Sequence, residues 1–202
     1  MGARMHRKIR ERAKSMNILL LCEWESSEVG IQIRNAVQDI LEQEGHHVQM
    51  IILNSKELKP CVACLGCWLK TPGQCLITDD EANNIAFQQI NANAIMLISK
   101  ITYGGFSADI KAFLDRSLQN IMPYLVNYKG EIHHPMRYKR FPIWIVVGYG
   151  NVSNAEKRTF TILAERNALN MRPAKHLAVT VDSNDELVKE AGNILKALEV
   201  GV

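Results

Sequence analysis

Five short apolar runs, separated by segments of helical spacing, constrain the fold of this 202-residue chain most strongly. An apolar run without polar alternation is typical of a strand buried on both faces. The runs are residues 17–22, 48–53, 94–99, 143–147 and 176–181. Parallel strands need long crossover connections, and the intervening segments can supply them as helices. The pattern therefore predicts an α/β fold, a doubly wound sheet of five parallel strands with helices on both faces.

Local end signals place the helices between these strands. Gly45 is a stop signal for the first helix, and Ser107 can cap the third helix after a turn at Gly104 and Gly105. Residues 123–140 are a polar, aromatic-rich insertion without a clear period. A substrate lid, a nicotinamide-phosphate contact, a dimer surface and a solvated loop are its open alternatives. The predicted helices are residues 31–44, 81–90, 108–119, 155–169 and 185–198.

The chain length and the lack of a linker indicate one domain, residues 16–202, after a basic N-terminal arm at residues 1–15. The arm holds six Lys or Arg against one Glu, and a helical arm, a disordered tail and an upstream start are its alternatives. Its charge is too local for a nucleic-acid surface. No apolar run approaches the roughly 20 residues of a membrane span, and the arm lacks the apolar centre of a signal peptide. We therefore expect a cytoplasmic protein without nucleic-acid or membrane partners.

Four of the five cysteines fall within 15 residues, spaced C-x2-C-x2-C-x7-C. Where thiols stay reduced, such clusters usually bind metal or do redox chemistry. Three thiolates at this spacing can surround one centre and a fourth can close it, as in a 4Fe–4S cluster, whereas zinc sites more often use two separate CxxC pairs. A thiol-rich lid without metal is the third alternative. The candidate metal ligands are Cys61, Cys64, Cys67 and Cys75, and Cys22 is expected in the core.

Ligands of doubly wound sheets bind at the carboxyl ends of the strands, near the point where the strand order reverses. The loops expected at this edge are residues 23–30, 100–106 and 148–153. Because the cysteine segment follows the second predicted strand, we expect it to open onto the same edge. Glycines in these loops let backbone N–H groups approach a ligand, and Tyr103 offers an aromatic face beside them.

Three motifs resemble those of the NADPH-dependent FMN reductase family within the flavodoxin-like superfamily, and more narrowly its branch with a cysteine-rich loop, the iron–sulfur flavoproteins. The first is the cysteine segment with TPG at 71–73 and DD at 79–80. The second is SKITYGGFSADIKAFLDR at 99–116, and the third is HHPMRY at 133–138. The resemblance covers the chain from about residue 16 to its end.

The resemblance implies a sheet of order 2-1-3-4-5 with FMN at its carboxyl edge, the phosphate in the loop after the first strand and the ring between the loops after the third and fourth. It also implies hydride transfer from NAD(P)H to flavin N5, which needs no catalytic side chain. A quinone, a flavin or another small molecule would be the acceptor, and the protein would be a homodimer or homotetramer. The implied cofactor-binding residues are Ser26, Ser27, Lys100, Thr102, Tyr103, Gly104, Gly105, Phe106, Gly148, Tyr149, Gly150 and Asn151.

The predicted phosphate loop departs from the family pattern. Glu23, Glu25 and Glu28 stand where small residues and an arginine are usual. A carboxylate about 4 Å from a phosphate charge costs roughly 1 kcal/mol in water and about 4 kcal/mol at an effective dielectric near 20. Against this, the next helix N-terminus favours an anion, Glu28 suits the first turn of a helix, and Lys100 can return positive charge.

Three functions follow from these observations. The leading one is an FMN-dependent NAD(P)H oxidoreductase acting on a quinone, flavin or other small electron acceptor. An iron–sulfur flavoprotein that carries electrons is an alternative, which the cysteine spacing favours. A flavodoxin-like partner subunit with a degenerate flavin site is another, which the acidic loop favours.

Overall fold

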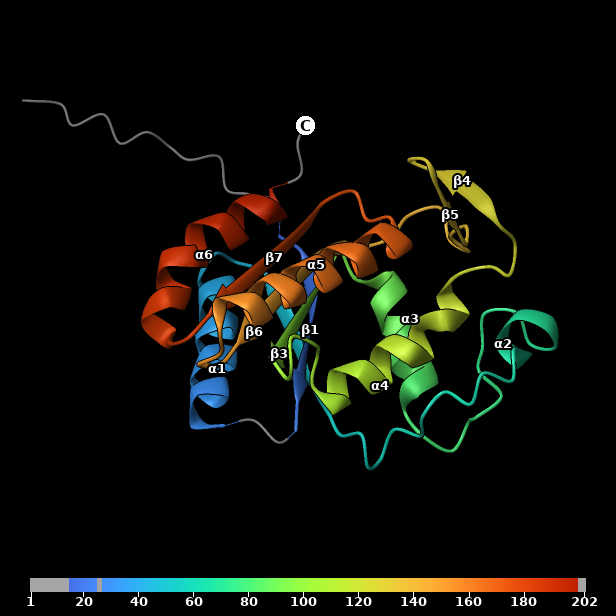
Figure 1. The fold of residues 1–202 in the computed structure, drawn as a ribbon, viewed down its shortest axis with the longest axis horizontal. Helices are drawn as coiled ribbons and strands as arrows, with labels where there is room; N and C mark the ends of the chain where they lie inside the picture. The colour runs from blue at the N-terminus through green and yellow to red at the C-terminus, as the bar shows by residue number, and fades with distance from the viewer. Residues whose placement is uncertain (1–14, 25–26, 200–202) are drawn as a thin grey trace, which may run out of the picture.

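The computed structural model describes residues 15–24 and 27–199, and five long strands form one sheet in the order β2-β1-β3-β6-β7 (Figure 1). All neighbouring strands in it are parallel. Numbered among themselves, the five strands have the predicted order 2-1-3-4-5. The predicted arm at 1–15 lies outside the described residues except for Ser15. The strands are β1 (Asn17–Glu23), β2 (His47–Leu53), β3 (Ala94–Lys100), β6 (Ile143–Tyr149) and β7 (His176–Val181).

Helices cover both faces of the sheet, as the apolar runs predict. Alternate strand residues enter two separate buried clusters, so Leu19 and Leu21 face one layer while Ile18 and Leu20 face the other. One layer is α1 (Glu28–Gln43) and α6 (Asn184–Leu198). The other layer is α3 (Ala82–Asn91), α4 (Ala108–Arg116) and α5 (Asn154–Met171).

Serine caps start the helices that follow the carboxyl ends of the strands. Ser107 accepts a hydrogen bond from the Ile110 N–H at the start of α4, as predicted. Ser27 accepts from the Gly30 N–H, so α1 starts at Glu28, three residues before the predicted position 31. An N-cap oxygen satisfies a backbone donor that the first helical turn leaves free. These caps fix the helix N-termini at the edge where a ligand is expected.

The insertion before β6 contains a short antiparallel hairpin, β4 (Val126–Tyr128) and β5 (Glu131–His133), which the sequence did not predict. Its side chains attach it to the C-terminal half of α5, because Arg166 pairs with Glu131 and the His133 ring contacts Asn170. Since α5 begins after β6 and ends before β7, this half lies near the amino edge of the sheet. The hairpin is therefore held at the edge opposite to the expected ligand loops.

The predicted helix at 108–119 is divided into α4 and the 3-10 helix η1 (Ser117–Asn120). The cysteine segment contains one more short helix, α2 (Gly66–Leu69). None of the helices among the described residues has both the length and the apolar character needed to span a membrane.

Candidate functional site

The loops after β1, β3 and β6 meet at the carboxyl edge of the sheet, as expected. The Lys100 N–H donates to the Glu23 carboxylate over 3.0 Å, which joins the ends of β3 and β1. The Ile101 N–H donates to the Tyr149 carbonyl over 2.9 Å, which joins the ends of β3 and β6. The three predicted ligand loops therefore start from one hydrogen-bonded edge.

Glu23 is a buried part of this edge and does not stand in a solvated loop. It is the last residue of β1, only 2% exposed, and its carboxylate also accepts a hydrogen bond from the Tyr149 hydroxyl. The Tyr149 hydroxyl fits against the first turn of α1, since a Cβ at Gly30 would lie 2.1 Å from its oxygen. The prediction that Glu23 belongs to the loop after the first strand is therefore wrong, because it is the last residue of β1 and its carboxylate is used inside the protein.

Asp109 connects two further loops to α4 through hydrogen bonds. Its carboxylate accepts hydrogen bonds from the Trp24 N–H over 2.9 Å and from the Ser55 N–H over 2.7 Å. Trp24 follows β1 and Ser55 follows β2, so one side chain in the first turn of α4 holds both loops. No local pattern in the sequence marks Asp109 as a residue that holds loops. An acid just after a helix cap is usually explained by its favourable interaction with the helix dipole. The sequence therefore gives no reason to expect that Asp109 also accepts hydrogen bonds from two loops.

A tight turn after β3 presents an aromatic side chain to solvent. Thr102 and Gly105 exchange two backbone hydrogen bonds of 3.0 and 2.8 Å, with φ of 50° at Tyr103 and 75° at Gly104 between them. A Cβ at Gly104 would lie 2.9 Å from the Thr159 Cβ, so the turn needs glycine to lean on α5. Tyr103 is 94% exposed. The turn thus places a bare aromatic ring beside the edge.

The predicted cofactor-binding residues divide into two groups. The first group reaches the surface of the edge or is half-buried there, and can meet a ligand directly. The second group is buried: Phe106 packs edge-on against Phe160, and a Cβ at Gly148 would overlap the same ring at 2.4 Å. The surface group is Ser27, Lys100, Thr102, Tyr103, Gly105, Gly150 and Asn151, and the buried group is Gly104, Phe106, Gly148 and Tyr149. Ser26 and Glu25 lie outside the described residues.

The four clustered cysteines differ in burial, and Cys67 is the one whose pKa is shifted. Burial raises the pKa of the Cys67 thiol, and the Cys75, Cys61 and Cys64 side chains raise that pKa further. Cys67 and Cys75 are buried, while Cys64 is exposed. Among the described residues, no three His, Cys, Asp or Glu side chains are placed so that they could hold a metal ion. The assignment of these cysteines as metal ligands stays a prediction.

The cysteine segment packs at the far end of α4 and does not open onto the carboxyl edge. The Trp68 indole N–H donates to the Leu118 carbonyl over 3.1 Å, and the Cys75 N–H donates to the Gln119 side chain over 3.0 Å. Both acceptors belong to η1, which follows the C-terminus of α4. Figure 1 shows α2 beyond α3 and α4, away from the sheet. The expected opening onto the ligand edge is thus replaced by packing on η1.

A buried ion pair holds the end of this segment to α4. Arg116 donates to both carboxylate oxygens of Asp80, at 2.7 and 3.1 Å, and both side chains are almost fully buried. Arg116 also donates to the carbonyls of Lys59 and Ile77, before and after the cysteines. Burial alone would raise the pKa of Asp80, but hydrogen bonds from Arg116 and from the Ala82 and Lys59 N–H groups outweigh it and lower that pKa.

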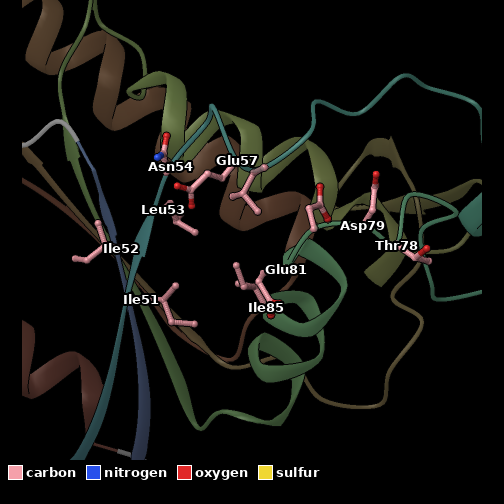
Figure 2. Close-up of a pocket in the computed structure, with 11 residues that line it drawn as sticks. Ile51, Ile52, Leu53, Asn54, Glu57, Thr78, Asp79, Glu81 and Ile85 are labelled. Carbon is pink, nitrogen blue, oxygen red and sulfur yellow. The ribbon is translucent and has the colours of Figure 1, made fainter.

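A cavity of about 410 Å³ opens elsewhere, between β2 and α3 (Figure 2). Its floor is apolar, with Ile51 and Ile85, and its rim carries the carboxylates of Glu57, Asp79 and Glu81. Its lining in the described chain includes none of the predicted cofactor-binding residues. A carboxylate rim disfavours a phosphate. An anionic ligand therefore fits the carboxyl edge, with its helix N-terminus and Lys100, better than this cavity.

Sequence comparisons connect the chain to iron–sulfur flavoproteins. An iron–sulfur flavoprotein of Methanocaldococcus jannaschii is 40% identical over 85 residues, which is 42% of each chain. An iron–sulfur flavoprotein of Methanosarcina thermophila is 26% identical over 87 residues, 43% of this chain and 44% of the relative. The matched part thus spans less than half the length of either relative. A comparison with protein-family models gave no match.

Structural comparisons show the flavodoxin-like fold. The NAD(P)H:quinone oxidoreductase of Methanothermobacter marburgensis matches with a TM-score of 0.67 at 11% identity, over 93% of this chain and 98% of the other. An FMN-dependent NADH-azoreductase of Bacillus anthracis, solved with FMN, matches with a TM-score of 0.59 at 12% identity, over 90% of this chain and 97% of the other. Together with the sequence relatives, these matches confirm the predicted family resemblance.

Proposed function

From the premise that this chain has the flavodoxin-like fold and resembles the FMN reductases and iron–sulfur flavoproteins, we propose that it is an FMN-dependent NAD(P)H oxidoreductase. The observation that carries the proposal is the convergence of the loops after β1, β3 and β6 on one edge, joined through Glu23, Lys100 and Tyr149. In doubly wound sheets this edge is the ligand site. The names of the structural matches support FMN and a nicotinamide donor. A quinone, a flavin or another small molecule is the proposed acceptor.

The residues at the edge fit FMN in three respects. The N-terminus of α1, capped by Ser27, presents backbone N–H groups to an anion, and the exposed Lys100 adds a positive charge. The turn at Gly104 and Gly105 lets backbone approach a flat ring. Tyr103 adds an exposed aromatic face. Bound FMN would supply hydride acceptance and release, so the protein needs to provide binding, orientation and electrostatics.

The buried contacts explain how the chain keeps this edge in shape. Glu23 draws the ends of β1, β3 and β6 together, and Asp109 fixes the start of the β1 loop. Both carboxylates accept hydrogen bonds from groups within the protein. These donors partly offset the negative charge that a bound phosphate would meet. Glu28 differs because it is exposed in the first turn of α1. Among the acids of this region that the structure describes, it is the one whose charge opposes an anion at the helix N-terminus. We therefore propose an FMN site that works but is weakened by Glu28.

Anaerobic mixing of the FMN-loaded chain with NADPH or NADH tests this function. We expect the flavin absorbance to bleach much faster than that of free FMN, and to return when a quinone is added. The same mixture with the protein heat-denatured is the control. Bound FMN that neither nicotinamide reduces faster than it reduces free FMN would contradict the proposed activity.

A second candidate function is electron transfer through an iron–sulfur cluster. The spacing of the four cysteines in the sequence favours it, because C-x2-C-x2-C with a fourth cysteine is a donor set for 4Fe–4S. Cys61, Cys64, Cys67 and Cys75 would hold the cluster. Anaerobic purification should then give close to four irons per chain, against none in a Cys67→Ser variant. If iron-free protein kept an unchanged reductase rate, a cluster would not be required for the activity.

A further inference from the structure

The cavity between β2 and α3 has an apolar floor that belongs to the core of its layer. Ile51 of β2 and Ile85 of α3 line it from two sides (Figure 2), and Leu58 of the turn after β2 completes the floor. Leu58 and Ile85 are only 5% and 4% exposed. The volume of about 410 Å³ falls within the range of about 300 to 1,000 Å³ that is usual for small-molecule sites. The cavity is therefore large enough for a small organic molecule.

Every charged side chain in the described lining of this cavity is an acid, and there are four of them. Two of the four are compensated by cations that stand outside the lining. Asp79 pairs with Lys59 at the surface, and Asp80 pairs with the buried Arg116. These two ion pairs leave half of the negative charge around the cavity to be accounted for.

Glu57 and Glu81 carry the remaining charge. Neither forms an ion pair with another residue that the structure describes, and both are exposed. The Asn84 amide donates to Glu81 over 3.0 Å, but this donor is neutral. Glu57 comes from the turn after β2 and Glu81 immediately precedes α3, so the two acids belong to different walls (Figure 2). Two uncompensated carboxylates thus stand above an apolar floor.

We propose that this cavity binds a small organic cation, an amine with an apolar body. The body would lie on the floor formed by Ile51, Leu58 and Ile85, and the ammonium group would lie between Glu57 and Glu81. A neutral molecule would leave both carboxylates uncompensated, and an anion would be repelled by them. A bare metal ion fits less well, because no three His, Cys, Asp or Glu side chains among the described residues are placed to hold one.

The cavity lies where the cysteine segment leaves the fold and returns to it. Residues 54–58 lead into that segment and residues 78–81 lead out of it, and both stretches contribute to the lining. A cation held between Glu57 and Glu81 would therefore connect the two ends of the segment, next to the place where Arg116 pairs with Asp80. The site is separate from the carboxyl edge of the sheet, so the proposal does not depend on flavin binding.

Nuclear magnetic resonance of the isotope-labelled 202-residue chain tests the site with three probes of similar shape. Phenylbutylamine, phenylbutanol and phenylbutyrate carry a positive, a neutral and a negative end. We expect the amine to shift the backbone amide signals of residues 51–58 and 78–85, with a dissociation constant of about 0.1 to 5 millimolar. The alcohol should bind about fivefold more weakly, and phenylbutyrate more weakly still. A second cavity of about 310 Å³, at residues 47–49 and 87–92, has no acid in its described lining, so the amine should cause no saturable shift there.

Amide hydrogen exchange of the same chain tests the connection to the cysteine segment. A ligand that binds only when both ends of the segment are in place stabilises that arrangement. Saturating phenylbutylamine should therefore slow exchange in residues 59–77, whereas phenylbutyrate should not. An unchanged exchange rate with saturating amine would overturn this connection.

Substitution of the two acids tests the role of charge. Glu57→Gln and Glu81→Gln should each weaken the amine about threefold and together about tenfold, with little change for the alcohol. Asp39→Asn, at an exposed position on α1 in the opposite layer, is the matched control and should leave amine binding unchanged. A native chain without a saturable shift at about 20 millimolar amine would overturn the proposal. So would equal affinities for the amine and the alcohol, or a double variant that binds the amine as well as the native chain.

Discussion

Glu23 at the end of β1 and Tyr149 at the end of β6 form a buried hydrogen bond that passes across the intervening strand β3. The Lys100 N–H at the end of β3 donates to the same carboxylate, so three neighbouring strands share one acceptor. The Tyr149 hydroxyl also sets the space allowed to Gly30 in the first turn of α1. This pair couples the shape of the proposed flavin edge to the packing of the sheet.

Removing the Tyr149 hydroxyl should loosen that edge. We expect Tyr149→Phe to lower the free energy of unfolding by about 1.5 to 3 kcal/mol, because a hydrogen bond to a charged acceptor is lost in a buried place. Urea denaturation measures the change. Tyr103→Phe is the matched control, and its effect should stay within about 0.5 kcal/mol since that ring is in solvent. Equal effects of the two substitutions would contradict a structural role for the pair.

The buried ion pair between Arg116 and Asp80 should decide whether the cysteine segment stays docked. Replacing Arg116 by Met leaves a buried carboxylate without its partner, which typically costs about 3 to 5 kcal/mol. We also expect Cys67 and Cys75, which are buried in the native chain, to react faster with a thiol reagent. Lys111→Met on the same helix removes only an exposed pair and should cost at most about 1 kcal/mol. Native-like thiol protection in Arg116→Met would refute this role.

The same pair predicts a dependence of stability on pH. The pKa of Asp80 is lower in the folded chain than in the unfolded chain, where it is about 3.9. A lowered folded pKa contributes stability fully above the unfolded pKa, and this stability is lost as pH falls through the folded pKa. The free energy of unfolding should therefore decrease below about pH 4, and decrease less steeply in Arg116→Met. Urea titrations from pH 3 to pH 6 compare the two chains, and identical slopes would contradict the assignment.

The sequence predicted the main sheet because its signals are local. Each central strand is a continuous apolar run, and two of the helices have end signals in the sequence, at Gly45 and Ser107. The hairpin at β4 and β5 lacked such signals, since its strands have three residues each. Its two-residue turn has positive φ at Lys129 and Gly130. Such a turn usually has the sequence Asn-Gly, and with lysine at the first position it is not recognised from the sequence.

The candidate site was predictable in its place but not in its contacts. Chain order brings the loops after β1, β3 and β6 to one edge, so their meeting follows from topology. The burial of Glu23 depends on Tyr149, 126 residues further on, and no spacing in the sequence connects the two. The docking of the cysteine segment depends in the same way on Asp80 and Arg116, which are 36 positions apart in the sequence. Contacts between segments far apart in the sequence depend on tertiary packing. Local sequence patterns therefore do not predict them.

Glu28 should reduce the affinity for FMN through its charge. We expect Glu28→Gln to lower the FMN dissociation constant about three- to tenfold, because up to about 1.4 kcal/mol of repulsion near the phosphate is removed. The gain should shrink as salt rises, since an exposed charge is screened within about 10 Å at 0.1 M. Riboflavin, which lacks the phosphate, should bind both chains equally.

Asp39→Asn on the same helix is the matched control for this substitution. Asp39 is exposed and lies 11 residues further along α1, about 16 Å from Glu28, so its charge is screened from the first turn. It should leave FMN affinity unchanged. A gain of equal size in the two variants would show a general effect of net charge and not one of the α1 N-terminus.

Titration of the flavin-free chain with FMN, followed by the quenching of flavin fluorescence, tests most directly whether the carboxyl edge is a flavin site. We expect one FMN per chain with a dissociation constant of about 1 to 100 micromolar, equivalent to roughly 5.5 to 8 kcal/mol. Lys100→Glu should weaken FMN about tenfold and leave riboflavin unchanged. A native chain that binds no FMN at millimolar concentration would contradict a flavin site at this edge and would favour a flavodoxin-like partner subunit instead.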